Sequence, residues 1–182
     1  MRRREILKRE KVPFKIIRST YEEIHSGLSA PSHHVIMHAK GKAKHAVIPE
    51  KYRTRNKHRL IIMGADTLVY FRGKLLGKPK SFSHASQMLK RMMGGSHTVY
   101  TGLTLRDVST GQMKSGYAKS RVWFKKWPQD KIRRYVRTVN SLDKAGAYAI
   151  QMKPSIAEKY EGSLSNIIGL PVELLRKMLR SF

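Results

Sequence analysis

Four stretches of the chain repeat apolar residues every three or four positions, and this spacing is typical of amphipathic helices. Residues 2–11 are expected to form a further short helix with Ile6 and Leu7 as its only strong apolar positions, and the four amphipathic helices begin at Ser32, Ser83, Pro128 and Pro171. Serine can cap a helix and proline fits its first turn, which supports the last three of these starts.

A near-continuous apolar run and several alternating runs predict β-strands. The run RLIIMGAD, residues 59–66, is typical of a strand buried on both faces, as in a parallel sheet. Alternating runs at 97–107 and 117–124 flank the turn residues 109–111 and predict a hairpin. A small hairpin is predicted over residues 67–77 with Arg72-Gly73 at its turn, and shorter strands are predicted over residues 14–17, 146–151 and 156–160.

The order of these elements defines the fold class. Helices and strands are interleaved with hairpins, which predicts an α/β protein with a mixed sheet rather than a bundle or a sandwich. The stretch EEIHSGLSAPS, residues 22–32, is expected to be a loop because of its Gly, Pro and Ser content. Neither an internal repeat nor a linker is evident, so we expect one domain over residues 1–182.

The net charge of the chain indicates which kinds of molecule the protein is expected to bind. Lysine and arginine number 38 against 12 aspartates and glutamates, which gives a net charge of +26 that attracts polyanions such as nucleotides and nucleic acid. The chain has no cysteine, which excludes disulfides and thiolate metal sites. No apolar run approaches the ~20 residues of a membrane helix. We therefore expect a cytoplasmic protein without a membrane span, and the few acidic residues become the informative ones.

Asp66 is the strongest candidate for chemistry. It follows the buried run, and ligands of open α/β sheets bind beyond the carboxyl ends of the strands. A carboxylate there can hold a hard cation or accept a proton from water, although an aspartate that caps the following turn fits the pattern too. The adjacent pair Glu22-Glu23 could complete a magnesium site with Asp66, or be two solvated loop residues. Lys42 and Lys78 could each grip a phosphate, or be ordinary surface lysines.

Several familiar motifs are absent. The segment GKLLGKP has three residues between its glycines and a proline after the lysine, so it is not a phosphate-binding P-loop. His34 and His38 have the spacing of a metal pair, but the sequence offers no HExxH and no third ligand, and we interpret them as helix-face residues. A GxSxG elbow is missing as well, which leaves covalent catalysis without support.

Four long segments, in order, resemble the Maf (septum formation inhibitor) family. They are GADTLV, GKLLGKPKSFSHASQMLKRMMGGSHTVYTGLTL, YVRTVNSLDKAGAYAIQ and GSLSNIIGLPVELL. The resemblance runs from Arg2 to the end of the sequence. It implies an α/β sheet with an elongated cleft between two lobes, similar to inosine triphosphate pyrophosphatases. It also implies hydrolysis of nucleoside triphosphates between the α- and β-phosphates, with a divalent cation such as Mg²⁺ or Mn²⁺, in a protein that tends to form homodimers.

The resemblance also assigns roles to individual residues. Asp66 matches the catalytic acid that binds the metal and activates water, and Glu23 matches its acidic partner. Lys42 and Lys78 resemble the phosphate-binding lysines. The remaining matches are the tandem arginines Arg2 and Arg3, and the residues Thr67 and Gln151 of the branch that prefers dTTP and UTP.

Three departures from the family pattern leave alternatives open. The family normally opens with a strand and a serine-containing loop, whereas this sequence begins at the arginines, so the first strand is expected to be missing. Met152-Lys153 stand where the family usually has glycines, and Lys119 and Arg121 where members often have acids. The main hypothesis is therefore a dTTP/UTP pyrophosphatase, with modified nucleotides as further candidate substrates. The alternatives are a catalytically impaired Maf-like scaffold that binds nucleic acid or other polyanions, and a truncated gene product.

Overall fold

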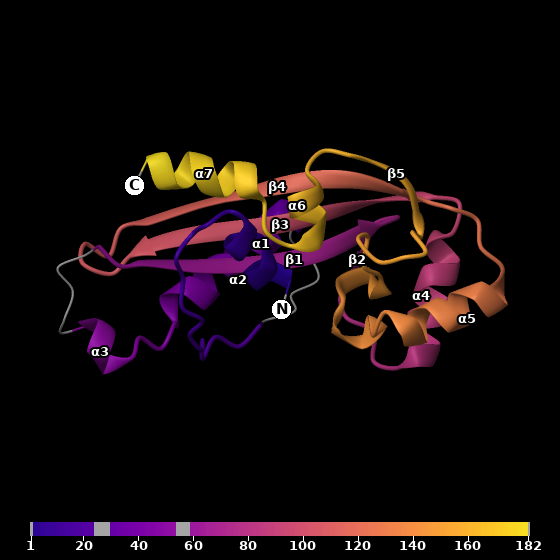
Figure 1. The fold of residues 1–182 in the computed structure, drawn as a ribbon, viewed down its shortest axis with the longest axis horizontal. Helices are drawn as coiled ribbons and strands as arrows, with labels where there is room; N and C mark the ends of the chain where they lie inside the picture. The colour runs from indigo at the N-terminus through magenta and orange to yellow at the C-terminus, as the bar shows by residue number, and fades with distance from the viewer. Residues whose placement is uncertain (1, 24–29, 54–58, 182) are drawn as a thin grey trace. The chain divides into compact units, whose positions relative to one another are not determined.

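The computed structural model describes residues 2–23, 30–53 and 59–181. Its central element is a five-stranded sheet with the strand order β2-β1-β3-β4-β5 (Figure 1). The strands are β1 (Ile61–Phe71), β2 (Lys74–Leu76), β3 (Ser96–Asp107), β4 (Met113–Phe124) and β5 (Ala157–Glu161). β2 pairs antiparallel with β1, and β5 pairs antiparallel with β4. This open sheet with flanking helices confirms the predicted α/β class.

The chain's contacts divide it into two compact units. Unit 1 contains residues 1–66, 101–118 and 169–182, and unit 2 contains residues 67–100 and 119–168. The single domain expected over residues 1–182 stays a prediction.

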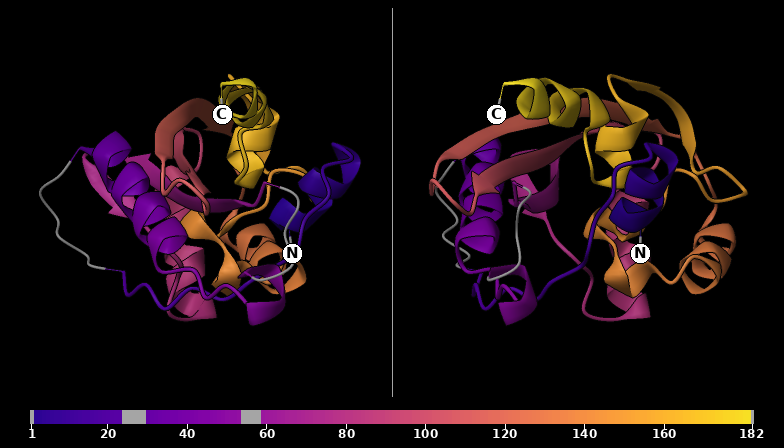
Figure 2. Two further views of the ribbon diagram at one scale, coloured as in Figure 1. Left: turned by 90° about the vertical axis from the view of Figure 1, so that its left-hand side faces the viewer. Right: turned by 60° about the vertical axis from the view of Figure 1, so that its left-hand side comes forward.

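Unit 1 carries the first and last helices of the chain. They are α1 (Arg2–Arg9), α2 (Pro31–Lys44), α3 (Glu50–Arg53) and α7 (Val172–Arg180). The predicted periodicity of α2 is confirmed at Val35, Ala39 and Ala43, which are buried. Helix α7 lies along β4, where the Leu174 side chain approaches Gly116 (Figures 1 and 2). The unit therefore has helices whose apolar faces pack on its part of the sheet.

A tight turn closes the hairpin of β3 and β4 in unit 1. Asp107, the last residue of β3, accepts hydrogen bonds from the backbone N–H of Ser109 (2.8 Å) and Thr110 (3.3 Å) and from Arg59 Nε (2.5 Å). Hydrogen bonds from Ser109 and Arg59 hold the pKa of the Asp107 carboxyl well below its usual value. The predicted hairpin and its turn residues are thus confirmed, and an aspartate stabilises the turn.

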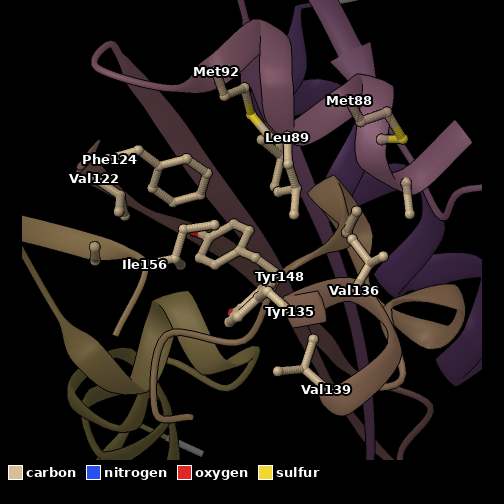
Figure 3. Packing of buried hydrophobic residues seen from close by; sticks show 14 of the residues in the cluster. Met88, Leu89, Met92, Val122, Phe124, Tyr135, Val136, Val139, Tyr148 and Ile156 are labelled. Atoms are coloured by element: carbon tan, nitrogen blue, oxygen red, sulfur yellow. The ribbon is translucent and has the colours of Figure 1, made fainter. Parts of the chain in front are cut away.

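Unit 2 is built around its own apolar core. Its helices are α4 (Phe82–Met92), α5 (Gln129–Thr138) and α6 (Leu164–Ile168), with short 3₁₀ turns at Ser141–Asp143 and Ala145–Ala147. Figure 3 shows side chains of α4 and α5 packed against Phe124 and Tyr148. His97 lies in this core at 2 % exposure, with its Nε2 2.9 Å from the Tyr148 hydroxyl. Burial lowers the pKa of His97 to about 4, so the imidazole is neutral at physiological pH.

Several predicted elements are wrong in detail. Residues 14–17 form no strand, and Ile16 is 74 % exposed. Residues 146–151 contain the end of a 3₁₀ turn and a second turn at 150–151 in place of a strand, because Gly146 and Ala147 both have positive φ. The cap of α4 is Ser81, whose side chain accepts a hydrogen bond from the backbone N–H of His84, and not Ser83.

A further difference concerns the predicted buried run, residues 59–66. It forms a strand that continues without a break from residue 61 to residue 71. This strand pairs antiparallel with β2, whereas the sequence pattern had indicated a parallel sheet. Asp66 therefore lies inside a strand and not at its end. The expected loop at 22–32 falls largely on residues 24–29, which lie outside the described part of the chain.

Candidate active site

The position of the site in unit 1 follows from the close contact between α2 and β1. A Cβ added at Gly64 would lie 2.2 Å from Ala39 O and 2.8 Å from Ala43 N, so only glycine permits this approach. Side chains alternate along a strand, so Asp66 lies on the same face of β1 as Gly64 and points toward α2. Lys42 lies between Ala39 and Ala43 in the turn of α2 that packs against Gly64. Its side chain therefore reaches Asp66.

Lys42 joins two carboxylates that are far apart in the sequence. Its Nζ lies 2.6 Å from Asp66 Oδ1 and 2.6 Å from Glu23 Oε1. The two oxygens consequently lie no further apart than twice that distance. The side chains are 24 % exposed for Lys42, 14 % for Asp66 and 42 % for Glu23, so the cluster is accessible to solvent at one edge.

Tyr21 holds the Glu23 segment against α2. A short antiparallel bridge joins Ser19 to Ala46 just past the helix. Two residues further on, the Tyr21 ring contacts His38 edge-on at 5.6 Å between centroids. A Cβ at Gly41 would lie 2.2 Å from the Tyr21 ring, so this glycine is needed for the ring to approach the helix so closely. Gly41 weakens the helix intrinsically, and the packing of Tyr21 accounts for its presence there.

Arg3 brings a second cation into the cluster. Its Nε donates a hydrogen bond to the carbonyl of Gly169, 2.7 Å away. Burial lowers the pKa of the Arg3 guanidinium, Asp66 raises it, Arg2 lowers it and Glu23 raises it. A guanidinium remains charged in proteins, so two cations and two carboxylates lie within electrostatic range of one another.

The donor set fits a divalent cation that is shared with a substrate. Within the ranges that the structure describes, no group of three or more His, Cys, Asp or Glu residues could hold a metal ion by itself. Magnesium, however, is commonly bound by one or two carboxylates together with waters and substrate phosphates. Asp66 and Glu23 supply two such carboxylates. An oxygen atom of each lies 2.6 Å from the Lys42 Nζ atom, so the two carboxylates converge on one point. The pair therefore matches what magnesium or manganese requires from a protein.

Three predicted substrate residues lie in unit 2. Thr67 follows Asp66 on β1 and is half-buried, and Lys78 is exposed in the loop after β2. The backbone of that loop is fixed by a hydrogen bond from Gly146 N to Gly77 O, 3.1 Å long. Gln151 is exposed and lines a hollow of about 420 Å³ beside β5. The roles assigned to these three residues remain predictions.

Sequence reasoning missed one buried cation. Lys144 is 8 % exposed, and its Nζ donates to Asn140 O at 2.7 Å and contacts Asp143 Oδ1 at 2.5 Å. Its position in the DKAGAY segment was visible, but an excess of basic residues gave no reason to single it out. Its neighbour Asp143 is the exposed partner of this lysine.

The fold and the cluster together define an α/β protein with a carboxylate–lysine–arginine site suited to a phosphate and a hard cation. The model of the Maf family, described as Maf-like protein, matches residues 1–182. The chain belongs to this family.

The chain is also similar to curated relatives that are named as dTTP/UTP pyrophosphatases. A dTTP/UTP pyrophosphatase of Clostridium tetani is 39 % identical over 181 residues, which is 98 % of this chain and 92 % of the relative. A dTTP/UTP pyrophosphatase of Pelotomaculum thermopropionicum is 36 % identical over 182 residues, or 100 % and 92 % of the two chains. A third, from Caldicellulosiruptor bescii, is 39 % identical over 180 residues, with 98 % and 89 % covered. In addition, no helix within the described ranges has the length and apolar character to cross a membrane.

Proposed function

We propose that this protein hydrolyses dTTP and UTP to the nucleoside monophosphate and pyrophosphate. The observation that carries the proposal is the carboxylate of Asp66, held by Lys42 beside Glu23 in a chain of the Maf family. The names of the relatives in three bacteria support the nucleotide specificity. Modified pyrimidine triphosphates are further substrates under the same proposal.

The chemistry begins with charge. A triphosphate brings about four negative charges, and a water molecule attacks phosphorus only if they are offset. Lys42 and Arg3 supply two positive charges at the cluster. When the substrate binds, the Lys42 ammonium group replaces one of its two ion pairs with a contact to a phosphate oxygen. A divalent cation on Asp66 and Glu23 supplies further charge neutralisation and a Lewis acid.

Asp66 acts as the general base. The oxygen of a water molecule forms a bond to the α-phosphorus, a proton of that water passes to the Asp66 carboxylate, and the bond to the bridging oxygen breaks. Pyrophosphate leaves with that oxygen. Positioned bases of this kind contribute roughly 10²–10⁴-fold to rate.

The unit 2 residues complete the proposal. Lys78 binds the phosphate tail, while Thr67 and Gln151 hydrogen-bond the pyrimidine edge. Arg2 contributes its charge next to Arg3. We further propose that the protein works in the cytoplasm, uses Mg²⁺ or Mn²⁺, and forms a homodimer.

A pyrophosphate-release assay tests the function. Purified protein with dTTP or UTP and Mg²⁺ is expected to release pyrophosphate, and Asp66→Asn is expected to lower kcat by at least about 10²-fold. Asp130→Asn is the matched control, because Asp130 is an exposed carboxylate on α5 that pairs with Arg134. Equal rates for Asp66→Asn and Asp130→Asn would refute the role of Asp66.

A further inference from the structure

Unit 2 gathers aromatic and basic side chains on the face of its strands that points away from the apolar core. The hydrogen bonds from Phe124 N to Gly95 O and from Asp107 N to Gln112 O fix the register of β3 and β4. In this register Tyr100 lies opposite Lys119, and Ser96 lies opposite Trp123. On the next strand, Trp123 lies opposite Lys159. The basic aromatic face comprises Tyr70, Tyr100, Lys119, Arg121, Trp123 and Lys159.

The aromatic rings of this face come from three different strands. Tyr70 on β1 meets Tyr100 on β3 edge-on, with ring centroids 6.4 Å apart. Trp123 on β4 is half-buried and completes the set. These residues are scattered in the sequence, and strand pairing brings them together.

Cations accompany the rings. Arg121 Cζ lies 4.9 Å and Lys159 Nζ 4.8 Å from the Trp123 ring. Arg121 is held by hydrogen bonds from its Nε and Nη2 to Ser96 Oγ. Lys119 lies two residues before Arg121 on the same face, about 6.8 Å away along the strand. Lys119, Arg121 and Lys159 are all exposed.

Acidic residues are scarce around this face. Unit 2 has only Asp130, Asp143, Glu158 and Glu161 as acids. Asp130 is paired with Arg134, and Asp143 is paired with Lys144. Of the four acids, only Glu161 lies on the basic aromatic face, where it is opposite Arg121. The surface therefore keeps a positive field in a chain whose net charge is +26.

We propose that the basic aromatic face binds single-stranded nucleic acid. Proteins that bind single strands without sequence preference combine cations along the backbone with aromatic rings on which bases stack. A duplex offers phosphates but hides the base faces in its stack, so the rings favour a single strand. A membrane surface would require exposed apolar side chains, and the exposed members of this face are charged.

The first test measures binding and its dependence on salt. A labelled oligodeoxyadenylate of about twelve nucleotides without a terminal triphosphate is titrated with the protein, with fluorescence anisotropy as the readout. Lys119→Gln with Arg121→Gln is expected to weaken binding at least tenfold. The slope of log K against log salt is expected to fall by about 1.4, since each lost phosphate contact on a single strand removes about 0.7.

The matched control removes the same charge elsewhere in unit 2. Lys90→Gln with Arg91→Gln changes two exposed cations in the last turn of α4, a helix that packs on the apolar core. This double variant is expected to keep affinity within about threefold, since it lowers only the general field. An equal loss in both double variants would overturn the proposal in favour of unspecific charge.

The second test isolates the aromatic component. Trp123 is the single tryptophan of the Trp127→Phe variant, and its fluorescence is expected to be quenched by the oligonucleotide. Trp123→Ala is expected to weaken single-strand binding about tenfold and to leave duplex binding nearly unchanged. Equal loss for single strand and duplex would overturn the assignment of stacking.

Two other outcomes would also overturn the proposal. One is absence of binding at about 150 mM salt, the physiological ionic strength. The other is a change of oligomeric state with Lys119→Gln and Arg121→Gln without any change in binding, which would assign the face to a second copy of the chain. Pyrophosphate release is measured on the same samples and is expected to be unchanged. A protein that fails to hydrolyse dTTP but binds the oligonucleotide would refute the proposed enzymatic function and leave this inference standing.

Discussion

Replacing Gly64 by alanine should separate α2 from β1 at the candidate site. The added Cβ would lie 2.2 Å from Ala39 O and 2.8 Å from Ala43 N. Both atoms belong to the backbone of α2, so no side-chain rotation relieves the contact. The helix has to move away from the strand, and Lys42 moves with it.

The distances give the size of the effect. Cβ atoms essentially never come closer than 3.0 Å to such neighbours, so α2 has to retreat by roughly 1 Å, a displacement that can cost about 10²-fold in rate. Overpacking of a well-packed contact typically costs about 1–3 kcal/mol in the free energy of unfolding. We therefore expect kcat/KM for dTTP to fall by about two orders of magnitude and the midpoint of urea unfolding to fall with it.

Two measurements on one preparation check this prediction. Pyrophosphate release gives kcat/KM, and urea unfolding gives the loss of stability. Gly95→Ala is the matched control, because its Cβ would meet only ordinary contacts, the nearest at 3.5 Å. A Gly64→Ala protein with normal kinetics and stability would refute the idea that close packing of α2 sets the position of Lys42.

Two further outcomes are expected. His97 has its pKa lowered from 6.5 to about 4, so the folded state keeps it neutral while the unfolded state takes up a proton below pH 6.5. Its contribution to stability is complete above pH 6.5 and falls by up to about 3 kcal/mol as the pH drops toward 4. Urea unfolding at several pH values should show this slope, and His97→Phe should flatten it; an unchanged slope would show that other groups cause it. Tyr21→Ala removes the ring that packs on Gly41, and we expect a higher Mg²⁺ requirement with nearly normal unfolding, because Glu23 loses its support; an unaltered metal titration would exclude this role for the ring.

Local patterns account for the elements that were predicted correctly. The apolar spacing of α2 and α4 and the alternation of the β3–β4 hairpin each depend on neighbours within one element, and both are confirmed. Residues 14–17 have an apolar pattern too, but the described chain there makes no ladder with another strand, and Ile16 stays exposed. The apolar pattern of a segment indicates that it is compatible with a β-strand. The segment forms one only where a neighbouring strand is available to pair with it.

Contacts between distant residues explain what the sequence could not predict. Ala145–Ala147 forms a 3₁₀ turn, and Gly146 there packs so closely on Val69 that a Cβ would lie 2.8 Å away. The contact of Lys42 with both carboxylates depends on Gly64, and nothing in the spacing of residues 42 and 66 indicates it. Asp66 was singled out because it follows the buried run, although the strand continues past it to Phe71.

The hydrogen bond from Arg3 Nε to Gly169 O has a consequence for how the molecule is assembled. Arg3 belongs to the first helix, while its acceptor is separated from it by 166 positions. During synthesis α1, α2 and Asp66 emerge from the ribosome well before Gly169, so the Arg3 guanidinium lacks this acceptor until residue 169 has been made. A nascent chain that stops short of Gly169 would consequently hold the acidic pair and Lys42 without an anchored arginine.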